Sequence, residues 1–112
     1  MHRGIRNILL IALLQLATPA QAAWVTYNGK VEQILTYPGG TYFYVILDAQ
    51  PASPGNSTCN PALFAVDGPG ANKTLSIVEL AAATERSLAI TIDDAATCVG
   101  GYLPVVRVTF IN

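Results

Sequence analysis

Histidine is nearly missing from this chain of 112 residues, because the only one is His2, close to the N-terminus. His2 lies in a stretch with the features of an export signal, so we expect a mature chain with no imidazole. Serine–histidine and cysteine–histidine nucleophile pairs are then excluded, as are zinc sites built on histidine. An enzyme of this composition would depend on carboxylates alone, and their spacing suggests no catalytic pair. We therefore expect a protein that is not an enzyme.

Basic residues are also few. Residues 23–112 carry four basic side chains against seven acidic ones, which leaves a net charge of −3. The basic residues are Lys30, Lys73, Arg86 and Arg107. Such a chain offers no positive surface for a phosphate backbone, so we expect no nucleic-acid partner.

Cysteine is limited to Cys59 and Cys98. In an exported chain these two are expected to form a disulfide, and closing a loop of that length would contribute roughly 4 kcal/mol. Two lone cysteines lack the other ligands that a metal site needs, so we expect no metal and no cofactor. The adjacent pair Asp93 and Asp94 is interpreted as a solvated strand end, because calcium requires six or more oxygen ligands.

The first 22 residues have the three parts of a secretory signal. Arg3 and Arg6 precede the apolar run 8–17, and Ala20-Gln21-Ala22 places small residues at the positions that specify cleavage. The apolar run has about half the length that a bilayer span needs. We expect cleavage after Ala22, a mature chain that does not insert into the membrane, and a single domain over residues 23–112 in the periplasm or medium of a bacterium.

Alternation of apolar and polar residues predicts five strands, over residues 24–37, 41–48, 62–67, 87–94 and 103–112. In the first strand Val25, Tyr27 and Val31 share one parity and Ile34 has the other, which indicates a bend at a glycine or a β-bulge. Residues 49–61 are rich in proline and small polar residues and are expected to form a loop. A second loop, residues 94–102, lies between the last two strands.

A helix is predicted between the third and fourth strands. Ser76 followed by Glu79 fits a capping box, so the helix is expected to start near Ser76, with a buried stripe of Ile77, Leu80, Ala81 and Thr84. Three strands, a helix and two strands is the element order of a five-stranded OB-like barrel, a mainly β fold. A flat sheet with the helix on one face is the alternative.

The segment TYFYVILD, residues 41–48, is apolar on both faces. A barrel would enclose Phe43, Val45 and Leu47, and with them, from the last two strands, Ile90, Ile92, Val106 and Val108. The other parity, Tyr42 and Tyr44, would then point outward and be at least partly exposed. These rings could pack across strands, form a subunit interface or bind a sugar. Tyr37 and Tyr102, in the loops that flank the binding face of such barrels, are further candidates.

The chain resembles the B subunits of subtilase-cytotoxin and pertussis-like bacterial toxins, and related small exported proteins of unknown function. The resembling residues are Gly29-Lys30-Val31, the aromatic second strand around Phe43, Cys59 and above all the segment 76–92. The resemblance implies a barrel that forms a homo-oligomeric ring, commonly of five subunits, and binds host glycans without catalysis. Cys98 departs from the pattern, and no residue here matches the sialic-acid contacts of those toxins.

Two functional hypotheses follow. The first is a secreted or periplasmic non-enzymatic binding module with a glycan or a protein as its partner, whose ligand-binding residues are Tyr37, Tyr42, Tyr44 and Tyr102. The alternative is a small disulfide-stabilised interaction or inhibitor domain that acts through the proline-rich loop 49–61.

Overall fold

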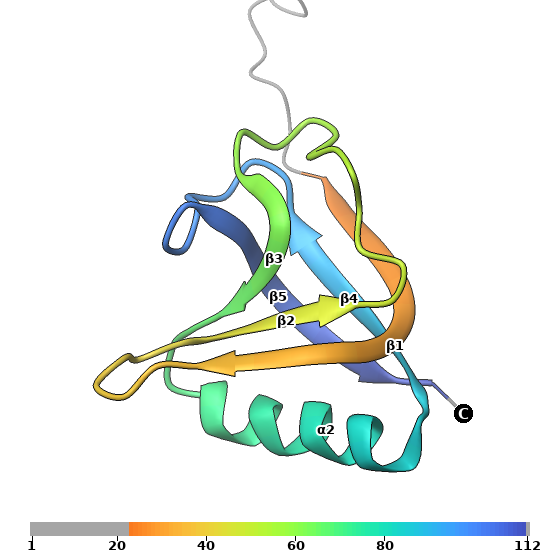
Figure 1. The fold of residues 1–112 in the computed structure, drawn as a ribbon. Helices are drawn as coiled ribbons and strands as arrows, with labels where there is room; N and C mark the ends of the chain where they lie inside the picture. Colours follow the sequence, from red (N-terminus) through yellow and green to blue (C-terminus); the bar gives the residue numbers. More distant parts are fainter. Residues whose placement is uncertain (1–22, 112) are drawn as a thin grey trace, which may run out of the picture.

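The computed structural model describes residues 23–111, and the predicted signal lies outside them. Within this range the chain forms a closed barrel of five strands with one α-helix between the third and fourth (Figure 1). The elements are β1 (Trp24–Thr36), β2 (Phe43–Leu47), β3 (Asn60–Val66), α2 (Ala71–Thr84), β4 (Ser87–Asp93) and β5 (Tyr102–Phe110). This confirms the OB-like barrel and excludes the flat sheet.

The strands are hydrogen-bonded in the order β1-β2-β3-β5-β4, and β1 closes the barrel by pairing with both β2 and β4. The β3–β5 pair is parallel and the other four pairs are antiparallel. One strand can serve two neighbours because β1 bends where the register shifts between Val31 and Gln33. The expected β-bulge in the first strand is therefore confirmed.

The barrel interior is filled from several strands by side chains with no exposed surface. Val45, Phe64 and Leu103 occupy partnered positions on β2, β3 and β5 and share this inner face. Leu47, Leu88, Ile90 and Ile92 complete the core. Burial of each large aliphatic side chain contributes about 1.5–3 kcal/mol, so this layer supplies most of the hydrophobic stabilisation.

Val106 does not join the interior as predicted, since 44% of it is exposed. The β4–β5 register shifts at this point: Thr91 pairs with Arg107, and Ile92 pairs with Val105. Val106 is the extra residue on β5, and the shift breaks the simple alternation that would have turned it inward.

Helix α2 lies across one end of the barrel and contacts β1, β4 and β5 (Figure 1). It begins at Ala71 with Gly70 as N-cap, five residues before the predicted start. The capping box is wrong: Ser76 lies inside the helix, and its hydroxyl donates to the carbonyl of Asn72.

The buried face of α2 also differs from the prediction. Ala71, Val78 and Ala81 are buried, and Leu75 packs against the core beside them. Ile77 and Leu80 are 39% and 56% exposed, and Thr84 is exposed as well. Because the helix starts earlier than predicted, it includes Ala71 and Leu75, which lie at helical spacing from Val78. These three residues and Ala81 face the barrel in place of the predicted stripe.

Candidate functional site

The four tyrosines predicted as ligand-binding residues come together on the outside of the barrel. Tyr44 lies at the centre, and the centroid of its ring is 5.8 Å from that of Tyr37, 5.3 Å from Tyr42 and 5.2 Å from Tyr102. Each pair meets edge to face, the arrangement that aromatic rings prefer. We call these four residues the tyrosine cluster.

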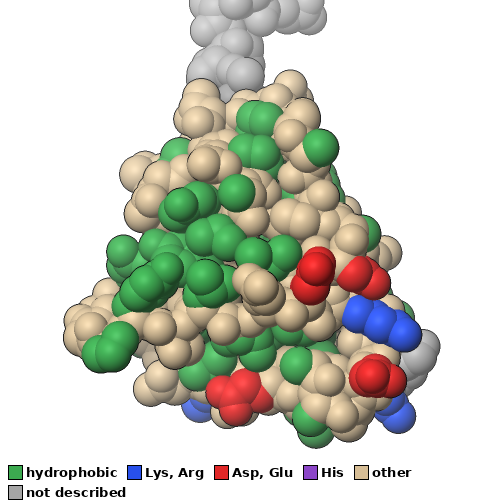
Figure 2. Space-filling view, in the orientation of Figure 1, with side chains coloured by type: hydrophobic (Ala, Val, Ile, Leu, Met, Phe, Trp, Pro, Cys, Tyr) green, Lys and Arg blue, Asp and Glu red, His purple; other side chains and the backbone are tan. Residues whose placement is uncertain are grey.

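The cluster is assembled from three separate segments. Tyr37 and Tyr42 come from the β1–β2 turn, Tyr44 from β2, and Tyr102 from the start of β5. Tyr44 pairs across the sheet with Ala65, which pairs in turn with Pro104, and both of these neighbours are buried. Figure 2 shows hydrophobic side chains gathered on this side of the molecule, over β2 and β3.

Exposure differs sharply within the cluster. Tyr37 is 55% exposed, Tyr42 and Tyr102 are partly exposed, and Tyr44 is only 6% exposed. The expectation that Tyr42 is partly exposed is confirmed, but the same expectation for Tyr44 is wrong. Tyr44 does take the outward parity, yet its three neighbouring rings cover it. A ligand can therefore reach the outer three rings, while Tyr44 supports them from below.

The turn before β5 also covers Tyr44. Val99 and Tyr102 exchange two backbone hydrogen bonds of 3.0 and 3.1 Å, which close a tight turn through Gly100 and Gly101. Both glycines have positive φ, +59° and +89°. A Cβ atom on Gly100 would lie 2.5 Å from the Tyr44 hydroxyl oxygen. Gly100 was not predicted as part of the site, although two adjacent glycines before Tyr102 are a signal of a special turn.

The cluster raises the pKa of Tyr44 to about 12. The main cause is the hydrogen bond between the Tyr42 and Tyr44 side chains, followed by burial and by the neighbouring phenols. Tyr44 therefore stays protonated and neutral well above physiological pH. It presents no charge beneath the surface that the outer rings form.

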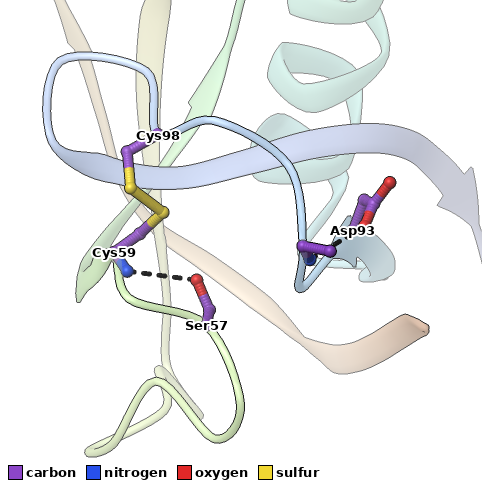
Figure 3. Close-up of a disulfide and its surroundings, with 5 residues drawn as sticks. Ser57, Cys59, Asp93 and Cys98 are labelled. Carbon is purple, nitrogen blue, oxygen red and sulfur yellow. Dashed lines mark hydrogen bonds between the residues drawn. A yellow bond between two sulfur atoms is a disulfide. The ribbon is translucent and has the colours of Figure 1, made fainter. Parts of the chain in front are cut away.

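The predicted disulfide between Cys59 and Cys98 is confirmed (Figure 3). Cys59 is buried, and its backbone N–H donates to the Ser57 hydroxyl over 3.1 Å. Next to it, the N–H of Asn60 donates to the carbonyl of Gly101 over 2.8 Å. The disulfide thus ties the loop that carries Gly100 to the start of β3, close to the tyrosine cluster.

A groove borders the cluster on the helix side, with a volume of about 350 Å³. It lies between the β1–β2 turn and the segment that leads into α2, and we call it the hairpin groove. Tyr37 and Tyr42 line it, together with the polar residues Thr36, Thr41 and Asn72. The remaining lining residues are apolar or glycine.

The proline-rich loop is held at its base. Gln50 accepts a hydrogen bond from the N–H of Leu47 and donates one to the carbonyl of Pro61, each 2.9 Å long. Its tip, including Ser53, Gly55 and Asn56, is exposed. The loop is therefore a surface feature with fixed ends.

Asp93 and Asp94 both accept backbone hydrogen bonds at the end of β4. Asp93 caps the following turn by accepting from the N–H of Ala95, and Asp94 accepts from the N–H of Ala23. Across residues 23–111 no three acidic, histidine or cysteine side chains gather in a way that could hold a metal ion. In the same range, no helix has the length and hydropathy needed to cross a membrane.

No protein-family model, curated protein or solved structure matches this chain.

Proposed function

We propose that the protein is an exported, non-enzymatic binding module that holds a glycan on the tyrosine cluster. One observation carries the proposal: tyrosines from the β1–β2 turn, β2 and the start of β5 meet on one surface. OB barrels use this region, the face of strands 2 and 3 and the loops beside it, to bind oligosaccharides and oligonucleotides. The net negative charge of residues 23–112 disfavours an oligonucleotide as the ligand.

The chemistry of the cluster suits a sugar. The rings of Tyr37, Tyr42 and Tyr102 offer partly exposed apolar surface with hydroxyls at the edge. Such surfaces can stack on the C–H face of a sugar ring and also donate to its hydroxyl oxygens. Because Tyr44 is buried under these rings, they are held in place before the ligand arrives, which lowers the entropy cost of binding.

The proposal is tested by measuring binding of the processed protein to an array of glycans, beside two matched variants. Tyr37→Ala removes the most exposed ring of the cluster and should weaken binding about three- to tenfold. Trp24→Ala removes another exposed ring, 62% exposed, at the opposite end of β1 and should leave binding unchanged. Equal effects of the two substitutions, or no binding to any glycan, would contradict the proposal.

A homo-oligomer like the B subunits of bacterial toxins is part of this proposal. Exposed apolar side chains on the outer face of α2 support it: Ile77 and Leu80 are 39% and 56% exposed, and a second subunit could cover them. Sedimentation velocity on the processed protein is expected to show a species several times the mass of one chain. A monomer at all concentrations would contradict the toxin-like homo-oligomer, and it would not affect the proposal that the protein binds a glycan.

The second candidate function is inhibition or binding of a protein through the loop 49–61. It is favoured by the fixed ends of that loop, which Gln50 and the Cys59–Cys98 disulfide hold while the tip stays exposed. Shortening the tip between Ser53 and Asn56 should abolish binding to a protein partner and leave glycan binding intact.

A further inference from the structure

The hairpin groove and the tyrosine cluster share two residues. Tyr37 and Tyr42 line the groove on one side and contact Tyr44 on the other. In Figure 1 the β1–β2 hairpin projects past the start of α2. Residues from both of these parts line the groove. A ligand that stacks on the outer rings therefore reaches the groove without crossing open surface.

The polar groups of the groove are all uncharged. Thr36, Thr41 and Asn72 supply two hydroxyls and an amide, Tyr37 and Tyr42 supply phenols, and none of the lining residues is acidic or basic. Hydroxyls and amides both donate and accept hydrogen bonds, as sugar hydroxyls do. The volume of about 350 Å³ is at the lower end of the range for ligand sites, roughly 300–1,000 Å³.

We infer that the hairpin groove holds one uncharged sugar unit of the glycan, with its hydroxyls bonded to Thr41 and Asn72. This inference rests on the proposed function and specifies the class of ligand. An anionic sugar would need a basic partner, and no such residue lines the groove. Lys73 is the basic residue adjacent to it in sequence, and the net negative charge of residues 23–112 repels anions at longer range.

Three substitutions test this inference by titration with paired glycans that differ only in a sialic acid or sulfate group. Asn72→Ala and Thr41→Val each remove a hydrogen-bonding group from an exposed position, so neither should affect folding. Each is expected to weaken binding of the neutral glycan about tenfold. Lys73→Gln, the matched control in the same helical turn, should leave that affinity unchanged.

The possible outcomes distinguish the inference about the hairpin groove from the proposed glycan binding on which it rests. Binding only to the charged glycan, with loss in Lys73→Gln, would overturn the inference and leave glycan binding standing. A neutral glycan whose affinity falls in Tyr37→Ala but not in Asn72→Ala or Thr41→Val would also overturn the inference and leave the proposed glycan binding in place. Failure to bind any glycan would overturn both.

An independent observation concerns the start of the described chain. The backbone N–H of Ala23 donates to Oδ1 of Asp94 over 2.9 Å, and the N–H of Asp94 donates back to the carbonyl of Ala23 over 3.1 Å. The next residue, Trp24, lies with its ring 5.5 Å from the guanidinium carbon of Arg107. Ala23 is thus fixed beside a carboxylate at the point where cleavage of the signal is predicted.

We also propose that Asp94 binds the α-ammonium group of the processed protein. Hydrolysis of the Ala22–Ala23 peptide bond leaves a carboxylate on Ala22 and converts the Ala23 amide into an ammonium group, at the position where Asp94 already accepts a hydrogen bond. The neutral hydrogen bond then becomes an ion pair, which is stronger. Processing would in this way fasten the N-terminus to the end of β4.

The test uses the exported protein and the rate at which its α-amine is acylated near neutral pH. The ion pair keeps the amine protonated and unreactive, so Asp94→Asn should raise the rate about two- to fivefold. Asp93→Asn is the control, because Asp93 accepts from Ala95 in the turn, and it should change the rate less. Equal rates in wild type and Asp94→Asn, or an exported N-terminus other than Ala23, would overturn this proposal.

Discussion

Replacing Gly100 by alanine tests how the tyrosine cluster is held together. Gly100 has φ of +59°, a conformation that costs an alanine about 1–2 kcal/mol. The added Cβ would also lie 2.5 Å from the Tyr44 hydroxyl oxygen, which is buried and cannot move freely. Overpacking of this kind costs about 1–3 kcal/mol. We therefore expect Gly100→Ala to lower the free energy of unfolding by about 2–5 kcal/mol, measured by urea denaturation.

Two further variants separate the steric contact from backbone strain. In a Tyr44→Phe background the hydroxyl is absent, and the nearest remaining atoms are 3.4 and 3.6 Å from the added Cβ, which is tolerable contact. Gly100→Ala should then cost only the strain of about 1–2 kcal/mol. Gly101→Ala, at φ of +89° with no atom within 4 Å of its Cβ, should cost a similar amount. The same loss from Gly100→Ala in both backgrounds would refute this account of the turn.

Three other predictions concern the disulfide, the buried phenol and the helix. Cys59→Ser and Cys98→Ser should each lower stability by about 4 kcal/mol, because both open the same loop, and losses that differ widely in denaturation would contradict this. The pKa of Tyr44 is about 12, above the ordinary 10, so the folded state holds this proton more tightly than the unfolded state. The stability that this proton contributes is complete below about pH 10 and is lost as pH rises toward 12. In a pH titration followed by phenolate absorbance, the step near pH 12 should vanish in Tyr44→Phe. Val78→Ala should cost about 1–3 kcal/mol, whereas Glu79→Ala, at the adjacent exposed position of α2, should cost less than about 0.5 kcal/mol, and thermal melts of the two variants measure the difference.

The barrel could be predicted from the sequence because strand order and alternation are local signals. The switch of parity between Val31 and Ile34 indicated the bulge that lets β1 pair with two neighbours. The bulge at Val106 had a comparable sign that was missed, because Leu103 and Val105 share one parity while Val108 and Phe110 have the other. The helix start was misplaced because Ser76 fits a capping pattern, while Gly70 and the packing of Ala71 against the barrel determine the actual start.

The residues of the candidate site could be predicted from the sequence, but not which of their rings are exposed and which one is buried. Outward parity placed Tyr44 correctly outside the barrel, yet its exposure depends on rings and a turn that come from distant parts of the chain. No local pattern shows that Gly100 lies over Tyr44. Asn72 was not among the predicted ligand-binding residues, because its place beside Tyr37 and Tyr42 arises only when the helix start meets the β1–β2 turn.

The most direct test of glycan binding on the tyrosine cluster is an NMR titration of the processed protein with a glycan that it binds. The ring signals of Tyr37, Tyr42 and Tyr102 are expected to shift together with a single affinity, because all three rings lie around Tyr44. The indole signal of Trp24, at the other end of β1, should stay in place. Shifts confined to the loop 49–61, or tyrosine signals that do not change at saturation, would contradict the proposed function.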